Sequence, residues 1–260
     1  ICTIMTTLEQ IEELRHKLNE YNRLYYVDNN PVVSDKEFDE MMYKLQELEK
    51  KHPEFFDPNS PTQRVGSDLT NRFEAVHHRY PMMSLSNTYS LEELHEFYER
   101  VVREAGETEF TCELKFDGTA ISLTYEKGRL IRAVTRGDGT MGDDVTSNVR
   151  TIRSIPLVLA GNDWPQTFEM RGEIYMPRAV FTMLNREKEE IGEQPFANPR
   201  NAAAGTLKLQ NSATVASRHP DCFLYALLGN DLLYKSHWDT HNKDPECGFR
   251  ISEPYTICHT

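Results

Sequence analysis

Apolar residues recur at helical spacing near the start of the chain. Each of two stripes holds four of them: Leu8, Ile11, Leu14 and Leu18, then Phe38, Met41, Leu45 and Leu48. Such a stripe buries one face of a helix and leaves the other face in water. Thr7 with Gln10 and Ser34 with Glu37 fit the capping box, in which paired side chains satisfy the free backbone donors of a helix start. We therefore predict two helices between residues 6 and 52, joined by an extended connection.

From residue 109 onward the apolar period shortens to that of strands. Alternation predicts strands over 110–115, 120–125, 129–135, 168–176 and 223–228, with Glu126-Lys127-Gly128 as a hairpin turn. Helices are predicted from Ser90, which fits a capping box with Glu93, and over 179–190. Strands and helices do not alternate regularly, and no Gly-x-Gly-x-x-Gly opens a helix, so the pattern favours an α+β fold over a Rossmann fold.

A polar stretch from His52 to about Thr70, containing Pro53, Pro58 and Pro61, separates the two patterns and has the composition of a linker or an irregular crossing. We place a domain boundary near residue 70. Residues 1–70 then form a small helical domain, and residues 71–260 form a domain of antiparallel sheets flanked by helices.

Composition indicates a globular protein that does not enter a membrane. Hydrophobic residues make up 38% and charged residues 27% of the 260 residues, and no apolar run approaches the roughly 20 residues needed to cross a bilayer. No basic and then apolar leader opens the chain. We expect a cytoplasmic monomer.

The five cysteines argue against two structural uses of thiols. They are odd in number, widely spread and without a Cys-x-x-Cys pair. This pattern disfavours a disulfide framework and a structural zinc site, and it favours the scattered thiols of a reduced protein. We predict no protein-bound metal site from these residues.

Lys115 stands in the run Cys112-Glu113-Leu114-Lys115-Phe116-Asp117-Gly118, with acids on both sides and a glycine after it. An ordinary lysine, with a pKa of about 10.4, is protonated at neutral pH and is a poor nucleophile. Burial or nearby positive charge can expose its lone pair. The run therefore allows two interpretations, a nucleophilic lysine or a solvated lysine ahead of an Asp-Gly turn.

The surrounding motifs favour the nucleophile. Lys115-x-Asp117-Gly118 resembles the first motif of the nucleotidyltransferases, and three further stretches follow in the expected order: 135–140 (Thr-Arg-Gly-Asp-Gly-Thr), 170–173 (Met-Arg-Gly-Glu) and 196–205 (Phe-Ala-Asn-Pro-Arg-Asn-Ala-Ala-Ala-Gly). Together they resemble the bacterial NAD-dependent DNA ligases from about residue 7 to about residue 228. The resemblance implies a nucleotidyltransferase (adenylation) domain preceded by a helical domain.

The resemblance also implies a reaction. Lys115 would attack the α-phosphorus of NAD, release nicotinamide mononucleotide and hold AMP as a phosphoramidate, with Mg²⁺ bound mainly through phosphates. Asp117 would assist the lysine or the metal, although it also suits a turn. A continuous strand would carry Glu113, Lys115 and Asp117 on one face, because alternate side chains share a face.

Several residues are assigned to the adenosine half by resemblance. Glu113, Ser84 and Leu85 would lie near adenine, Arg136 near ribose or phosphates, and Glu173 on the ribose hydroxyls, while Gly118 would let the backbone approach the nucleotide. Ordinary salt bridges compete for Arg136 and Glu173, and a strand entering the core competes for Ser84 and Leu85.

By resemblance, the helical domain determines which nucleotide serves as the AMP donor. Tyr25, Tyr26, Asp35, Phe38 and Asp39 align with the family's block that holds the nicotinamide mononucleotide half, in which aromatic rings stack on the pyridinium and acids offset its charge. Phe38 stands where the family commonly has tyrosine. On spacing alone, Tyr25 and Phe38 would pack one helix on another.

Two basic residues are candidates for contacts to nucleotide or DNA phosphates. Arg200 and Lys208 flank an alanine-rich segment and would contact nucleotide or DNA phosphates, or else lie on a solvated helix face. Lys208 stands where the family usually has arginine. The net charge of −12 makes the chain alone a poor DNA clamp, so we expect nicked DNA as partner of a longer enzyme and weak or no DNA binding by this chain.

The later lysine motifs of the superfamily do not follow Lys208, so the nucleotidyltransferase domain is expected to be truncated at its C-terminal end. Cations near the reacting phosphorus stabilise its transition state. We expect slow self-adenylation or none. The alternatives are an ATP-dependent ligase or capping-type nucleotidyltransferase, against which Tyr25, Tyr26 and Asp35 argue, and a catalytically incomplete nucleotide-binding module.

Overall fold

A computed structural model describes residues 6–26, 30, 32–64, 73–162, 164–230, 232, 234, 236–251 and 255–258. In these ranges helices and antiparallel sheets are combined, which confirms the α+β prediction. The predicted boundary at residue 70 lies outside the described residues. None of the helices described is long and apolar enough to span a membrane.

The chain begins with a pair of helices, α1 (Thr7–Tyr26) and α2 (Asp35–Lys51). Ile11, Leu18 and Leu45 are fully buried between them, as the stripes predict. The capping box at Ser34 and Glu37 is confirmed. The first box was placed one residue too late: Thr6 and Glu9, not Thr7 and Gln10, exchange the two capping hydrogen bonds.

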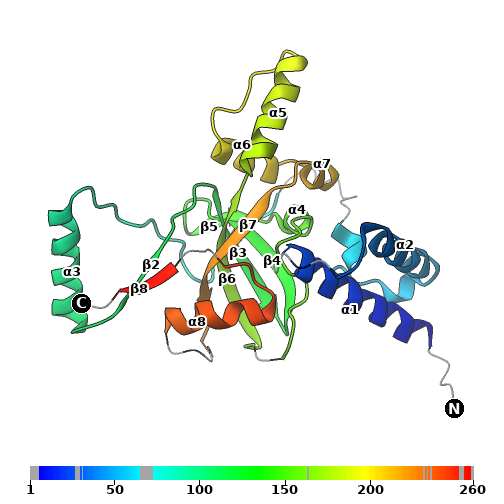
Figure 1. Cartoon of the computed structure of the whole chain (residues 1–260), viewed down its shortest axis with the longest axis horizontal. Coiled ribbons are helices and arrows are strands. Elements are labelled where there is room, and N and C mark those ends of the chain that lie inside the picture. The colour runs from blue at the N-terminus through cyan, green and yellow to red at the C-terminus, as the bar shows by residue number, and fades with distance from the viewer. Residues whose placement is uncertain are drawn as a thin grey trace.

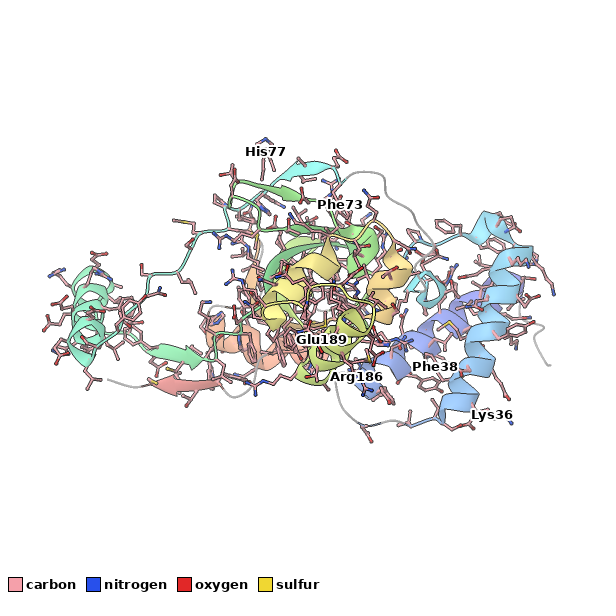
Figure 2. The ribbon with its side chains drawn as sticks, turned by 90° about the horizontal axis from the view of Figure 1, so that it is seen from above. Lys36, Phe38, Phe73, His77, Arg186 and Glu189 are labelled. Carbon is pink, nitrogen blue, oxygen red and sulfur yellow. The ribbon has the colours of Figure 1, made fainter. Side chains whose placement is uncertain are left out.

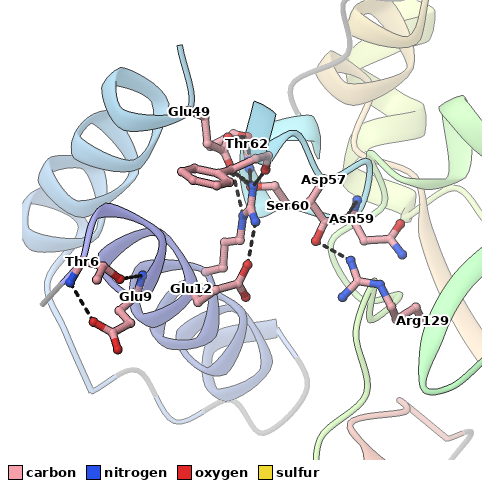
Figure 3. A network of polar contacts seen from close by, with 11 residues as sticks. Thr6, Glu9, Glu12, Glu49, Asp57, Asn59, Ser60, Thr62 and Arg129 are labelled. Carbon is pink, nitrogen blue, oxygen red and sulfur yellow. Dashed lines mark hydrogen bonds and ion pairs between the residues drawn. The ribbon is translucent and has the colours of Figure 1, made fainter. Parts of the chain in front are cut away.

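A buried arginine ties the helix pair to the segment that follows it. The Arg15 side chain donates to the carboxylates of Glu49 and Glu12 and to the Phe55 carbonyl oxygen, and Glu49 also accepts from Thr62 (Figure 3). Phe55 belongs to the short helix η1 (Pro53–Phe55) and Thr62 to η2 (Pro61–Arg64). Up to Arg64 the polar stretch is therefore an ordered crossing, which is one of the two predicted alternatives, and residues 65–72 lie outside the described structure.

A four-stranded antiparallel sheet, in the order β4-β3-β6-β7, forms the centre (Figure 1). Its strands are β3 (Thr119–Glu126), β4 (Arg129–Thr135), β6 (Thr167–Tyr175) and β7 (Asp221–Leu228). Lys127 and Gly128 both have positive φ, so the predicted hairpin is confirmed as a two-residue turn of mirror-image type. In the core, Tyr125 stacks on Phe168, and Phe249 packs edge-on against both rings.

The helix pair is attached to this sheet through its crossing segment. Asn59 donates to the carbonyl oxygen of Leu130 at 3.1 Å, and Asp57 forms an ion pair with Arg129, so both contacts reach β4. Arg64 donates to the carbonyl oxygens of Ile152 and Ile155. The N-terminal helices therefore lie beside the β4 edge of the sheet (Figure 1).

Two small sheets pair short strands: β1 (Ala75–His77) with β5 (Met141–Asp143), and β2 (Phe110–Glu113) with β8 (Tyr255–Cys258). The remaining helices are α3 (Leu91–Ala105), α4 (Thr146–Val149), α5 (Arg178–Glu190), α6 (Pro199–Leu207), α7 (Ser212–Ser217), α8 (His237–Lys243) and the short η3 (Asp244–Cys247). The predicted strand over 110–115 is too long, because β2 ends at Glu113.

Helix α3 projects from the rest of the molecule, at the end opposite α1 and α2 (Figures 1 and 2). Ser90 caps it as predicted, with its side chain accepting from the Glu93 amide. No residue of α3 is buried, and Leu91 remains 80% exposed. The apolar face of this helix is only partly covered, because Phe97 and Tyr98 contact Phe110 of β2 while Leu91 and Leu94 remain exposed.

Candidate functional site

Lys115 lies in the connection between β2 and β3, and its neighbour Phe116 anchors that connection. The Phe116 ring stacks on Phe223 of β7, with centroids 4.4 Å apart, and on Tyr175 of β6. Lys115 and Asp117, on either side of Phe116, are exposed. Because β2 ends at Glu113, the prediction that Glu113, Lys115 and Asp117 share one strand face is wrong, and aromatic packing sets the loop instead.

Gly118 closes the loop by direct contact with β6. A Cβ atom at this position would lie 2.2 Å from the carbonyl oxygen of Ile174, so only glycine fits. The Gly118 amide donates to a carboxylate oxygen of Glu173 at 3.1 Å. Glycine is required here because the backbone passes close to strand β6. The predicted approach of this backbone to a nucleotide stays a prediction.

The loop brings opposite charges together around Glu173. Burial raises the pKa of Glu173; the Gly118 amide and the positive charges of Lys115 and Arg200 oppose that effect, while Asp117 adds to it. Arg200, at the start of α6, pairs with Asp117 at 3.3 Å. Lys115, Asp117, Glu173 and Arg200 thus form one mixed-charge cluster.

The raised pKa of Glu173 predicts a pH effect on stability. The folded protein binds this proton more tightly than the unfolded chain does, so the stability that the group contributes is present below about pH 4.5 and is lost as the pH rises through the raised pKa. Urea unfolding across this range should therefore show the wild type losing stability relative to Glu173→Gln as the pH increases. Glu189→Gln, on the exposed face of α5, is the control. Parallel pH curves for wild type and Glu173→Gln would contradict the assignment.

Arg136 is positioned by the tight turn that follows β4. The Asp138 carboxylate accepts from the amides of Thr140 and Met141, both at 2.8 Å. Gly137 has φ of +57°, and a Cβ there would meet the Met141 carbonyl oxygen at 1.8 Å. The Arg136 backbone amide bonds the Ala120 carbonyl oxygen, which places Arg136 one strand away from Glu173, the partner of Ala120 across β3 and β6.

The Arg136 guanidinium reaches the extended segment that precedes α3. One Nη donates to Ser84 Oγ at 3.2 Å, whereas the buried Nε has no hydrogen-bond partner among the described residues. A buried donor without a partner costs free energy. Such a donor fits a ligand oxygen, and the competing interpretation of Arg136 as an ordinary salt bridge finds no carboxylate partner in the described structure.

The Ser84 segment is pinned against the sheet from two sides. Arg171 of β6 donates to the carbonyl oxygens of Tyr80 and Pro81, and the Met82 amide donates to the Gly139 carbonyl oxygen. Leu85 remains 75% exposed. The alternative of a strand entering the core is therefore wrong for Ser84 and Leu85: Ser84 accepts from Arg136, and Leu85 is exposed to solvent.

Tyr225 joins this site although the sequence analysis did not select it. Across β6 and β7, Arg171 pairs with Ala226 and Gly172 with Leu224, so Tyr225 is the extra residue of a bulge. Burial, and next the charge of Glu173, raise the pKa of Tyr225 to about 12. Bulges often redirect a side chain beside a functional site. An aromatic residue with a hydroxyl in an otherwise apolar strand was the available signal.

Other predicted residues lie elsewhere. Lys208, directly after the end of α6, forms an ion pair with Asp143 of β5 at 2.9 Å. Tyr25 is 48% exposed at the end of α1, and Asp39 is exposed on α2. Phe38 packs against the α1–α2 core, as its spacing alone suggested (Figure 2).

The predicted nicotinamide block is not assembled with Lys115. Tyr26 ends α1 and Asp35 begins α2, but their side chains lie outside the described structure. Helix α2 and strand β2, which precedes Lys115, lie on opposite sides of the central sheet (Figure 1). A cavity of about 530 Å³ does adjoin α1, but it is lined by residues such as Arg15, Arg129 and Arg153 and by none of the predicted ones.

Glu113 is engaged by two histidines of α8 instead of facing Lys115. His237 Nε2 lies 2.6 Å from one carboxylate oxygen, and His241 Nε2 lies 3.4 Å from the other. The spacing of the two histidines, four residues apart on one helix, was a signal that the sequence analysis did not use.

Comparisons with known proteins show the family to which the chain belongs. Residues 70–260 match the family of the NAD-dependent DNA ligase adenylation domain, and residues 5–66 match the DNA ligase-like, N-terminal NAD+-binding domain. The chain is 59% identical to a DNA ligase of Bacteroides fragilis, 57% to one of Phocaeicola vulgatus and 50% to one of Porphyromonas gingivalis, over at least 96% of its own length. It spans 38–39% of the length of these relatives. The chain belongs to the family of NAD-dependent DNA ligases.

Proposed function

We propose that this chain transfers AMP from NAD to Lys115. The observation that carries the proposal is the cluster in which Lys115, Asp117 and Arg200 surround the half-buried Glu173, with the unpartnered Nε of Arg136 one strand away. Cations suit a pyrophosphate and a carboxylate suits ribose hydroxyls, so both halves of an adenylyl group find partners here. The family membership supports NAD as the donor.

In the proposed step, the neutral amine of Lys115 attacks the α-phosphorus, and its excess proton passes to solvent or to a neighbouring carboxylate. A P–N bond forms, the P–O bond to the bridging oxygen breaks, and nicotinamide mononucleotide leaves with that oxygen. Arg136 and Arg200 offset the charge that develops on the phosphate oxygens. Asp117, which pairs with Arg200, holds that cation beside the lysine.

The positions of the other residues around the Lys115 loop suggest which of them would contact the adenosine and the metal ion. Ser84, Leu85 and Gly118 would border the adenosine, with Glu113 approaching from β2, and Tyr225 would lie behind the ribose. Mg²⁺ would be held mainly by substrate phosphates, with the exposed Asp117 as an additional oxygen ligand. Its chemical contribution when bound is to neutralise phosphate charge.

We also propose that Tyr25, Tyr26, Asp35, Phe38 and Asp39 receive the nicotinamide mononucleotide half. Since α2 lies across the sheet from β2, binding of both halves of one NAD requires the helix pair to approach the Lys115 loop. We propose a cytoplasmic monomer whose longer relatives seal nicked DNA. The net charge of −12 predicts that this chain alone binds DNA weakly or not at all.

A donor comparison tests this function. Incubation with NAD labelled in its adenylyl group should slowly label the chain, whereas equally labelled ATP should not, because ATP offers nothing to the nicotinamide-binding helices. Intact-protein mass spectrometry checks that one AMP group has been added. Equal labelling from both nucleotides would favour an ATP-dependent or capping-type nucleotidyltransferase, and binding without labelling would favour a non-catalytic module.

A further inference from the structure

Three potential metal ligands from distant parts of the sequence meet beside β2. Glu113 ends β2, and His237 and His241 lie one turn apart on α8. One ligand atom from each of the three side chains lies within 4.8 Å of the other two. The two imidazole rings are 4.3 Å apart between centroids, so both face the same carboxylate.

His241 has unmet bonding capacity in this cluster. Its side chain is fully buried, yet neither ring nitrogen makes a hydrogen bond of ordinary geometry within the described structure. Tyr255 of β8, which pairs with Glu113 across the small sheet, packs its ring edge-on against His241. A buried imidazole normally gives its nitrogens to a donor, an acceptor or a metal ion.

We propose that Glu113, His237 and His241 form a binding site for a divalent transition-metal ion of the zinc type. Imidazole nitrogen and carboxylate oxygen are preferred zinc ligands, and tetrahedral bonds of about 2.0–2.1 Å place ligand atoms roughly 3.3 Å apart. The 3.4 Å between His241 Nε2 and Glu113 is already of that size, and the pair at 2.6 Å needs only to open slightly. The histidine spacing, i and i+4 on a helix, is also that of many zinc-binding helices.

The site leaves a fourth coordination position to water. His237 is 44% exposed, so an ion can enter from solvent without unfolding the protein. A hydrogen-bonded charge pair would account for His237 and Glu113, but it leaves His241 Nε2 at 3.4 Å from the carboxylate and without a hydrogen bond of ordinary geometry among the described residues. The proposal rests on this geometry; it shares Glu113 with the proposed adenosine contacts, but its test measures metal binding and not adenylation.

The experiment is calorimetric titration of Zn²⁺ into metal-free protein. Wild type should bind one ion in this site, and His237→Ala should bind it at least about tenfold more weakly, since even second-shell changes cost 10–100-fold in metal affinity. Glu113→Gln, which keeps the side-chain shape, should weaken binding similarly. His95→Ala is the control, because His95 also pairs with a glutamate four residues away, Glu99 on α3, but lacks a second histidine.

Substitution with Co²⁺ identifies the ligands independently. A site of nitrogen and oxygen ligands gives visible cobalt bands without thiolate charge transfer, which separates it from binding by the exposed Cys112 and Cys258. The proposal is overturned if wild type binds no Zn²⁺, if His237→Ala and Glu113→Gln bind it like wild type, or if the cobalt spectrum shows thiolate ligands only.

Discussion

The Lys115→Ala chain should gain no AMP when it is incubated with NAD and Mg²⁺. Removal of a covalent nucleophile leaves the bound donor without an acceptor, and losses on the order of 10⁴-fold or more are typical. The fold should persist, because the exposed Lys115 forms no part of the core and Phe116 anchors the loop. Intact mass after prolonged incubation measures the yield of adenylated protein.

Lys51→Ala is the matched control for this substitution. Lys51 is a surface lysine at the end of α2, 68% exposed and paired only loosely with Glu47 at 4.0 Å. Its replacement should leave both the yield of AMP and the thermal stability unchanged. Retention of AMP by Lys115→Ala at the wild-type yield would exclude Lys115 as the acceptor.

Gly118→Ala should damage both the loop and the sheet beneath it. The new Cβ would meet a backbone oxygen of β6 at 2.2 Å, so the loop must shift and weaken the bond between the Gly118 amide and Glu173. Steric insertion of this kind costs about 1–3 kcal/mol in free energy of unfolding. We expect a lower urea midpoint and strongly reduced adenylation, since Lys115 moves with the loop.

Gly205→Ala provides the comparison, because it adds the same methyl group where no neighbouring atom lies closer than ordinary van der Waals contact. A Cβ at Gly205 in α6 would lie 3.5 Å from the Phe196 ring, which is ordinary contact, and alanine favours a helix. This variant should be as stable as wild type or more stable by about 0.4–1 kcal/mol. Equal stability of the two variants would show that the Gly118 contact is not tight.

Local signals predicted the parts of the fold that are locally determined. Ser34 with Glu37 began a helix, and Lys127 with Gly128 closed a hairpin, because capping and turn chemistry act within a few residues. The strand into Lys115 was predicted too long because Phe116 leaves the strand to pack on β6 and β7. The contact with Phe223 joins residues more than a hundred positions apart and has no local pattern.

The residues of the candidate site fall into the same two groups, those that local motifs identify and those that tertiary contacts place. Lys115, Arg136 and Glu173 lie in motifs that resemblance could identify, and the structure brings Lys115 and Glu173 together with Arg136 one strand away. Tyr225 enters through a bulge, and His241 lies on a helix whose histidines reach Glu113 at the end of β2, so sequence signals could mark these residues but could not tell what they contact. Tertiary contacts, not propensities, place these two side chains.

The position of the AMP group on the protein tests Lys115 as the nucleophile most directly. After prolonged exposure to NAD, digestion at neutral pH and peptide mass spectrometry should locate AMP on Lys115, and mild acid should release it, because protonation of nitrogen makes the amine a ready leaving group. AMP on another residue, an acid-stable linkage, or no AMP at all would contradict the proposed chemistry.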